Sequence, residues 1–349
     1  MSRVSLTQSR AGIVIIGAGP AAVMLLERLL AQHRRDTPEL PLEIRLVDPH
    51  APGGGRIWRR EQSPLLKLNS MLQDVAFFTD ASCELEGPIA PGPTLAEWVE
   101  GVRAGAFELP DWADEALLHE IATAAPTDFP TRRLNHAYLD WAFDETLRRA
   151  ASTVSVTWQR DVVTAVNAGG HAPGDPHAVH LASGAELRAD VVVHAVGHNG
   201  SLPSNEAIRL GAFADRHGLR YVAPAFTADL DLDWVGAGDD VIVRGMGLAA
   251  VDLTVLLTEG RGGRFDRLAN GRLRYRPSGR EPVLHLGSRR GVPYRSKITS
   301  SAVGDPVALE YLGPDFHRWI ASLERPLDFE RDVWPRIAAE MLTGYYREL

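Results

Sequence analysis

The stretch "IVIIGAGPAAVM", residues 13–24, combines an apolar run, two closely spaced glycines and an apolar continuation with helical spacing. The β-branched run "GIVII" is typical of a strand that is buried on both faces. Residues 21–33 have the spacing of a helix packed on a sheet, and "PLEIRLVDPH", residues 41–50, predicts a second strand that ends at Asp48. This order of strand, glycines, helix, strand and terminal carboxylate predicts a βαβ unit that binds a dinucleotide.

Each residue of this turn has a predicted role. Gly17 allows the tight turn, Gly19 lets the backbone approach a pyrophosphate, and Ala22 permits close packing of the helix on the strand. The amide groups and the dipole at the start of the helix suit a diphosphate, while Asp48 can accept hydrogen bonds from a ribose diol. The alternative for Asp48 is a surface turn residue before Pro49.

Three consecutive glycines, Gly53 to Gly55, follow the predicted ribose-binding position. Because glycine has no Cβ, this loop can pass close to a planar ligand or its phosphates, which makes Gly54 and Gly55 candidate cofactor-binding residues. Aromatic residues in the segment that follows could either wall a ring system or belong to an ordinary core. They are Trp58, which is a further candidate for cofactor binding, and Phe77 and Phe78.

A second stretch, "VIVRGMGLAAVD" at residues 241–252, repeats the arrangement. A predicted strand leads into Gly245 and Gly247, and Ala250 takes the third small position. The helix that follows is predicted to end at Gly260, as helices commonly end at glycine. The chain therefore contains a second nucleotide-binding turn.

The strand expected after this second helix is delayed by a predicted hairpin whose turn is Asn270-Gly271. The strand itself, "PVLHLG", is followed by Ser288, Arg289 and Arg290. Where an NAD site presents a carboxylate, these residues present a hydroxyl and two guanidinium groups, which suit the 2'-phosphate of NADP. The alternative is two solvated loop arginines, and the sequence does not rank Arg289 against Arg290.

The order of several motifs resembles that of the class B flavin-dependent monooxygenases, over most of residues 12–300. The motifs are "GAGPAA", "GGGRIW", "LNSMLQDVAFFTD", "RRLNHAYLDWAF" and "DVVVHAVGHNGSLPS". The middle ones look most like the N-hydroxylating branch, which modifies the amines of lysine and ornithine. The resemblance implies FAD at the first turn and NADPH at the second, with reduced FAD activating dioxygen to oxygenate a small molecule at an amine nitrogen or another soft centre.

The resemblance also implies roles for single residues. An amide-bearing side chain lies close to the flavin in this family, and Asn69 and Gln73 are the candidates for that catalytic position. Each has an alternative role as a hydrogen-bonding residue of a helix or loop. Gly197 is placed at the crossing between the two domains, and Arg132 or Arg133 is placed near the cofactor.

The predicted fold class is α/β, with two Rossmann-like three-layer dinucleotide-binding domains and a small β-meander. We expect an FAD-binding domain at residues 1–200 with the meander near 154–187, an inserted NADPH-binding domain at 201–300, and a C-terminal helical segment at 301–349. The last segment would return to the FAD domain or form a subunit interface. "VGDP", residues 303–306, is the candidate for a late glycine-acid segment near the flavin.

Composition limits the other classes of function. With a net charge of −8 the chain offers no general basic field for nucleic acid or an anionic membrane, and no apolar run approaches a membrane span. Cys83 is the single cysteine, which excludes a disulfide framework or redox dithiol within the chain and fits a cytoplasmic location. The apolar run near the amino end has a signal peptide as its alternative reading. The spacing of the histidines indicates no metal site, and the sequence has no GxSxG motif of a hydrolase.

The predicted function is NADPH-dependent flavin oxidoreduction, with monooxygenation of a small molecule as the specific reaction. A pyridine-nucleotide disulfide reductase is excluded because Cys83 has no partner cysteine. The remaining alternative is a non-catalytic or partner-dependent subunit of a heteromeric flavoprotein, because no clear strand and final helix follow "VGDP". In that case a partner chain would complete the flavin site.

Overall fold

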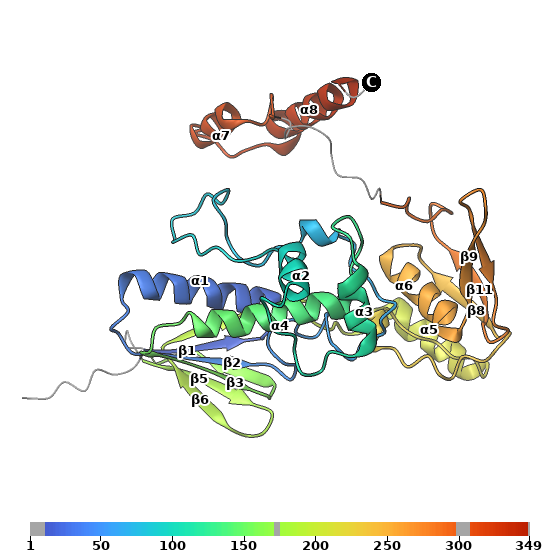
Figure 1. Ribbon diagram of the computed structural model, residues 1–349, viewed down its shortest axis with the longest axis horizontal. Coiled ribbons are helices and arrows are strands. Elements are labelled where there is room, and N and C mark those ends of the chain that lie inside the picture. Colours follow the sequence, from blue (N-terminus) through green and yellow to red (C-terminus); the bar gives the residue numbers. More distant parts are fainter. Residues whose placement is uncertain (1–10, 171–174, 298–307, 348–349) are drawn as a thin grey trace, which may run out of the picture. The chain divides into compact units, whose positions relative to one another are not determined.

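The computed structural model describes residues 11–170, 175–297 and 308–347, in two compact units, Met1–Thr299 and Ser300–Leu349 (Figure 1). The strands of the first unit are β1 Ala11–Ile16, β2 Leu42–Val47, β3 Val154–Gln159, β4 Val163–Asn167, β5 His177–Leu181, β6 Glu186–Ala189, β7 Val191–His194, β8 Asp240–Arg244, β9 Arg264–Arg267, β10 Leu273–Arg276 and β11 Val283–Gly287. Its α-helices are α1 Pro20–Asp36, α2 Leu95–Arg103, α3 Glu115–Thr123, α4 Arg132–Arg148, α5 Asn205–Arg216 and α6 Leu248–Leu257. Short 3₁₀ turns are η1 Leu72–Asp74, η2 Thr227–Asp229 and η3 Glu259–Arg261.

A four-stranded parallel sheet forms the centre of the amino-terminal region, in the order β3-β2-β1-β7. Its central strand β1 pairs with β2 and β7 on its two sides, so that Ile13 lies between Ile44 and Val191. The predicted β-branched run is therefore a buried strand, as expected, and α1 follows it directly. The prediction of an α/β fold is confirmed.

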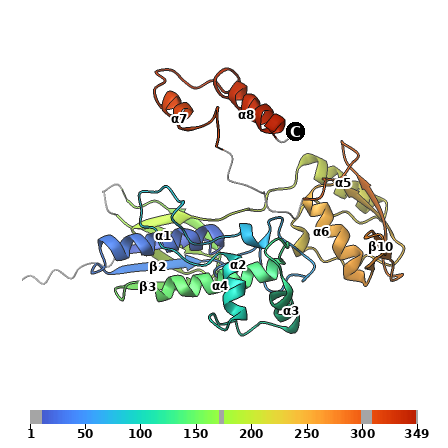
Figure 2. The same ribbon diagram turned by 45° about the horizontal axis from the view of Figure 1, so that its top comes forward.

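Helices cover one face of this sheet and an antiparallel meander covers the other. Ile15 and Ile44 pack with Leu26 of α1, while Val14 and Val47 pack with Val179 of the meander. Figures 1 and 2 show α1 and α4 running alongside the sheet. Because both faces of the sheet are covered by apolar side chains, the amino-terminal region has three layers.

The meander differs from the prediction in its first strand. It consists of β4, β5 and β6, whereas residues 154–159 form β3, which pairs parallel with β2 from Leu42↔Val154 onwards. The prediction of a meander that starts near residue 154 is therefore wrong. The physical reason is the preceding helix: parallel strands need a long crossover connection, and α4 provides it immediately before β3.

A helical core lies beside the sheet, built from α2, α3 and α4. Phe77 and Phe78 are buried in it with Trp98 and Tyr138, and Trp141 is partly buried against it. The two phenylalanine rings meet edge to face at a centroid distance of 4.8 Å. Of the two alternatives for Phe77 and Phe78, the structure supports core packing.

The second turn region contains a two-stranded parallel pair, β8 and β11, and an antiparallel hairpin, β9 and β10. The predicted hairpin is confirmed, with Gly271 in its turn at a φ of 79°. Helix α6 is shorter than predicted and ends at Leu257, because Gly262, with a φ of 95°, closes a 3₁₀ turn over residues 259–261.

The second unit is helical, as predicted for this segment. Its elements are α7 Pro314–Ala321, the π-helical turn η4 Phe329–Val333 and α8 Trp334–Arg347. Glu340 accepts hydrogen bonds from the backbone amides of Tyr311 and Leu312, and Asp332 pairs with Arg325 at 2.6 Å. "VGDP" lies outside the described residues. No helix among the residues that the structure describes is long and apolar enough to cross a membrane.

Candidate functional site

The first glycine turn, Gly17–Gly19, lies at the carboxyl end of β1. Gly17 adopts a φ of 108°, a conformation that favours glycine, and its amide donates to the carbonyl oxygen of Val47 at 2.8 Å. Gly19 is the N-cap of α1 and no side chain caps it, so amide groups of the first helical turn face outward from the sheet edge. Ala22 is fully buried, which keeps α1 close to the sheet. This end of the helix can hold an anion.

The glycine loop, Gly53–Gly55, packs directly on this turn. The amide of Gly53 donates to the carbonyl oxygen of Ala18 at 2.9 Å. A Cβ on Gly55 would lie 2.6 Å from the Cα of Gly19, and a Cβ on Gly17 would lie 2.3 Å from the carbonyl oxygen of Ala195. No side chain fits at these positions, so bare backbone surrounds the first glycine turn. Such a surface suits the close approach of a pyrophosphate, and the residues present fit FAD in this respect.

Asp48 follows β2 beside the same turn. Its Oδ2 accepts from the amide of Ala18 at 2.8 Å, and its Oδ1 accepts from the amide of His50 at 2.7 Å. A carboxylate has about four lone-pair sites, so these two bonds fix the group and leave acceptor capacity for a diol. The turn, the glycine loop and the acid predicted from sequence are therefore brought together.

Two buried residues that the sequence did not single out hold the loop after Gly55. His136 of α4 donates from Nδ1 to the carbonyl oxygen of Trp58 at 2.9 Å, and Gln62 donates to that of Ile57 at 2.8 Å. Burial lowers the pKa of His136, and the nearby carboxylate of Asp140 opposes that effect only in part. Trp58 is half-buried against the helical core. The His136 contact spans 78 residues, so no local motif could have indicated it, whereas Gln62 lies only five residues from Ile57.

The second glycine turn, Gly245–Gly247, has the same backbone geometry. Gly245 adopts a φ of 121°, and its amide donates to the carbonyl oxygen of Gly287 at 2.7 Å. Gly247 is the uncapped N-cap of α6, and Ala250 is buried. The surroundings are open: a Cβ on Gly245 would meet no atom within 4 Å, and a Cβ on Gly247 would meet only Tyr294, at 3.6 Å.

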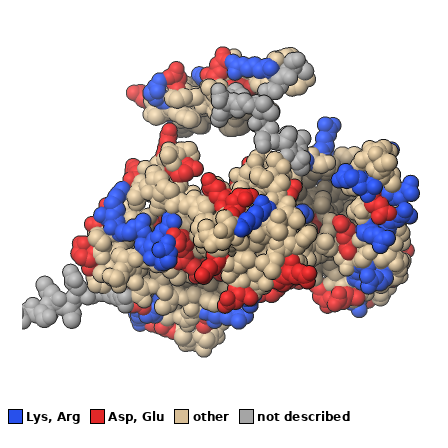
Figure 3. Space-filling model, in the orientation of Figure 1, with Lys and Arg blue, Asp and Glu red and all other residues tan. Residues whose placement is uncertain are grey.

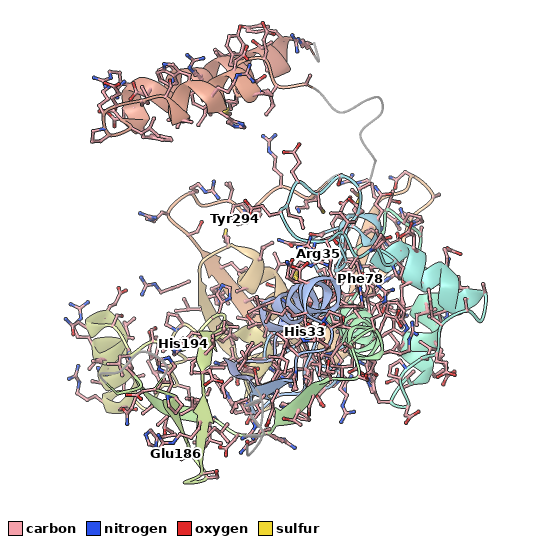
Figure 4. All side chains as sticks on the ribbon, turned by 90° about the vertical axis from the view of Figure 1, so that its left-hand side faces the viewer. His33, Arg35, Phe78, Glu186, His194 and Tyr294 are labelled. Atoms are coloured by element: carbon pink, nitrogen blue, oxygen red, sulfur yellow. The ribbon has the colours of Figure 1, made fainter. Side chains whose placement is uncertain are left out.

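Ser288, Arg289 and Arg290 follow β11 directly. Since Gly287 of β11 is in register with Arg244 of β8, these residues lie at the sheet edge that carries the second glycine turn. Both arginines are exposed, and the guanidinium of Arg290 lies 5.1 Å from the ring centre of Tyr294, which is labelled in Figure 4. The structure thus links Arg290 to the turn through Tyr294.

The segment that follows the second turn and its helix is rich in basic residues. Residues 261–297, the basic stretch, contain ten arginines and Lys297 but only two acidic residues, Asp266 and Glu281. Figure 3 shows basic side chains gathered over the β9 and β11 end of the unit. The whole-chain charge of −8 conceals this local field, which attracts anions such as a dinucleotide phosphate.

Ion pairs connect the regions of the two turns. Arg132 of α4 pairs with Asp252 of α6, and both side chains are 18% exposed. Asp229 pairs with Arg59 at 2.6 Å and with Arg56 at 3.1 Å. Burial raises the pKa of Asp252, and Arg132 acts against this effect. Arg132 is therefore engaged with the helix of the second turn.

Asn69 and Gln73 lie at the two ends of a segment that borders a hollow of about 360 Å³. The hollow is lined by Ser70, Met71, Asp74, Phe129 and Lys297. Neither amide side chain is among these lining residues. Asn69 is exposed and its carbonyl oxygen accepts from the ammonium of Lys297, while the backbone amide of Gln73 donates to Pro126 at 3.0 Å.

Gly197 lies three residues after β7, with a φ of 59°. It is exposed, and a Cβ placed on it would meet no atom within 4 Å. The structure therefore places Gly197 in an open position, unlike Gly17 and Gly55.

Comparison with known proteins gives consistent findings. Residues 14–199 match a family described as FAD-NAD(P)-binding. An L-aspartate N-monooxygenase (nitrosuccinate-forming) from Streptomyces davaonensis is 40% identical over 97% of this chain and 53% of its own length. A nitrosuccinic acid synthase from Aspergillus oryzae is 35% identical over 98% of this chain and 50% of its own length.

The chain spans about half the length of the curated relatives it matches. Among solved structures, the reduced form of an ornithine hydroxylase from Pseudomonas aeruginosa covers 70% of this chain and 50% of its own, with a TM-score of 0.39 and 12% identity.

Proposed function

This chain belongs to the FAD-NAD(P)-binding family, and from that premise we propose that it is an NADPH-dependent flavin monooxygenase that oxygenates the amine nitrogen of a small molecule. FAD would bind at the first glycine turn and NADPH at the second. The relatives named above are an L-aspartate N-monooxygenase and a nitrosuccinic acid synthase, so L-aspartate is the proposed substrate. Dioxygen would be the second substrate.

The observation that carries the proposal is the pair of glycine turns. They share one backbone geometry, with φ values of 108° at Gly17 and 121° at Gly245. The adjacent strand ends differ: the first turn has a carboxylate, Asp48, and the second has Ser288 with two arginines. A carboxylate suits a free ribose diol and guanidinium groups suit a 2'-phosphate, so the two turns favour different dinucleotides.

Different residues near the first turn would hold different parts of FAD. Gly17, Gly19 and Gly55 would face the pyrophosphate of FAD with bare backbone, and Asp48 would accept from its ribose. His136 would keep the loop at Trp58 in place. When bound, the two cofactors would supply a hydride and the activation of dioxygen, while the protein orients them and excludes water.

The catalytic role of Asn69 and Gln73 remains part of the proposal. Both residues belong to the segment 69–74, which contributes Ser70, Met71 and Asp74 to the lining of the hollow. An amide at its edge could hold a substrate or cofactor oxygen by hydrogen bonding. Exchange of each residue for leucine tests this role, with the rate of amine oxygenation as the readout.

One purification tests the function. We expect a yellow protein when FAD is supplied, whose flavin absorbance is bleached by NADPH in the absence of air. On readmission of air, L-aspartate should support formation of a nitrogen-oxygenated product, whereas succinate, which has the same carboxylates but no amine, should not. A colourless protein that neither takes up FAD nor oxidises NADPH would contradict the proposal.

A second candidate is a nucleotide-binding subunit that acts with a partner chain. It is favoured by β8, where Ile242 is 79% exposed although strands of parallel sheets are ordinarily covered on both faces. In this case the purified chain alone would bind FAD or NADPH without oxygenating L-aspartate, and activity would depend on an added polypeptide.

A further inference from the structure

We propose that Asp74 and Lys297 form a binding site for a free α-amino acid, in which Lys297 binds a substrate carboxylate and Asp74 binds the substrate ammonium group. The inference rests on the proposed function and names the residues that would recognise its substrate. It concerns the hollow beside Asn69 and Gln73.

The hollow has the size and lining of a small-molecule site. Its volume is about 360 Å³, within the range of ligand pockets. Met71 and Phe129 contribute apolar surface, Ser70 contributes a hydroxyl, and Asp74 and Lys297 contribute opposite charges. Three polar side chains beside two apolar ones can fix the orientation of a bound small molecule.

In the described part of the chain, the two charges are not paired with each other or with other charged residues. Within the described part of the chain, neither Asp74 nor Lys297 forms an ion pair within 4 Å, although they line the same hollow. The only hydrogen bond of the Lys297 side chain in that part of the chain goes to a neutral acceptor, the carbonyl oxygen of Asn69. A lysine ammonium has three donors, so it can bind a carboxylate as well.

Opposite charges that share a hollow without pairing match a zwitterion. A free amino acid carries a carboxylate and an ammonium group two bonds apart, and each would meet its complement here. A dicarboxylate without an amine would meet Lys297 favourably and Asp74 unfavourably, because like charges repel. The hollow therefore distinguishes an amino acid from the same molecule without its nitrogen.

The position of Lys297 is unusual for the composition of the chain. Of 37 basic residues, 35 are arginine, and the two lysines are Lys67 and Lys297. Both donate to backbone carbonyls: Lys67 bonds the carbonyl oxygen of Phe129 at 2.9 Å, and Lys297 bonds that of Asn69. Lysine offers a compact charge that fits where the planar guanidinium of arginine requires more room. Lys67 is not among the residues that line the hollow, which makes it a matched control.

Lys297 also lies close in sequence to the residues proposed for NADPH. It follows Arg289, Arg290 and Tyr294 in the same segment, and it contacts the segment that contains the proposed catalytic amides. The hollow is thus bordered by chain from both halves of the first unit, where a substrate would meet two cofactors.

The test measures equilibrium binding by calorimetry, with FAD-supplemented full-length protein and two probes, L-aspartate and succinate. We expect Lys297→Met to weaken binding of both probes about tenfold, the loss of one charge-assisted contact. We expect Asp74→Asn to weaken L-aspartate by a similar factor and to leave succinate unchanged or bound more tightly. Lys67→Met should bind both probes as the unaltered protein does.

Three results would overturn the inference: unaltered protein that does not bind L-aspartate, Lys297→Met with unaltered affinities, or Asp74→Asn that weakens both probes equally. Because the replaced side chains are at the surface, thermal unfolding of each variant checks that the fold is intact. Flavin bleaching by NADPH is read separately on the same samples. If NADPH bleaches the flavin but the variants bind the probes with unaltered affinities, only this site is contradicted. If the unaltered protein does not take up FAD, the proposed function is contradicted.

Discussion

At Gly17 and at Gly245 the chain makes the same bend. Each glycine amide donates to the carbonyl oxygen of the last residue of the neighbouring parallel strand, at 2.8 and 2.7 Å. The surroundings of the two bends differ. The first is enclosed by Ala195, the glycine loop and Asp48, while the second has open space around Gly245. Local sequence therefore sets the bend, and long-range contacts set how closely it is enclosed. An enclosed turn suits a cofactor that stays bound, and an open one suits a cofactor that exchanges.

The largest expected effect is the loss of stability when the glycine of each bend is replaced by alanine. Gly17→Ala would place a Cβ 2.3 Å from the carbonyl oxygen of Ala195 at a φ of 108°. Left-handed strain and overpacking together should cost about 3 kcal/mol or more. Gly245→Ala has the strain without the clash and should cost about 1–2 kcal/mol. Chemical denaturation followed by tryptophan fluorescence measures both, and equal losses would remove the distinction between an enclosed and an open turn.

The second prediction concerns the acid beside the enclosed turn. Asp48→Asn keeps the shape but replaces one acceptor oxygen with a donor that faces a backbone amide. Hydrogen bonds to charged groups contribute about 1.5–3 kcal/mol, so we expect a loss of that order in stability together with weaker FAD binding. Fluorescence titration with FAD measures the affinity. Asp161→Asn is the control, because Asp161 also accepts a backbone amide, from Val162 at 2.7 Å, away from the turn.

The third prediction concerns the strand end beside the open turn. Arg289→Ala should weaken NADPH roughly ten- to a hundredfold and leave NADH nearly unchanged, because only NADPH carries the 2'-phosphate. Arg290→Ala should do the same and also remove the contact with Tyr294. Arg272→Ala, another exposed arginine of the basic stretch, serves as the control. Equal losses for NADPH and NADH would contradict the assignment of this turn to NADPH.

The smallest expected effect is a pH dependence confined to the second turn region. Hydrogen bonds from the amides of Ser278 and Gly279 and the hydroxyl of Tyr275 lower the pKa of Glu281 to about 2. Because the pKa is lower in the folded protein, ionised Glu281 stabilises the fold above its unfolded pKa near 4.5, and this contribution is lost as the pH falls toward 2. Glu281→Gln should therefore be less stable than the unaltered protein at pH 7.

The same comparison at low pH checks the sign of this effect. Acid unfolding followed by circular dichroism should show the two proteins converging as the pH falls from about 4.5 toward 2. A difference that stays constant across this range would show that Glu281 acts through packing and not through its charge. Asp48→Asn should shift FAD affinity, whereas Glu281→Gln should not.

Sequence patterns predicted the elements whose signals are local. The strand before Gly17, the helix after it, the hairpin at Asn270 and the strand before Ser288 all depend on neighbouring residues, and all were found. The strand at residues 154–159 was assigned to the wrong sheet, because its composition suits either sheet and its partner β2 lies more than a hundred residues earlier.

The contacts that complete the candidate sites are also long-range. His136 reaches Trp58 across 78 residues, and Arg132 reaches Asp252 across 120. Tyr294 lies against Gly247, although α6, the hairpin and β11 separate the two residues in the chain. Such pairs depend on how helices and strands are brought together, which periodicity does not encode.

The contact between Gly17 and Ala195 sets an order of events during protein synthesis. Beside it, the amide of Gly12 donates to Asp190 at 2.7 Å across 178 residues, and β7 supplies the second neighbour of β1. While the ribosome is still making the intervening chain, one edge of β1 has no partner and attracts other unpaired strands. A nascent chain therefore depends on prompt arrival of β7, and premature termination before it would leave an aggregation-prone fragment. The nucleotide turn at the amino end, although synthesised first, is completed only after residue 195 has emerged.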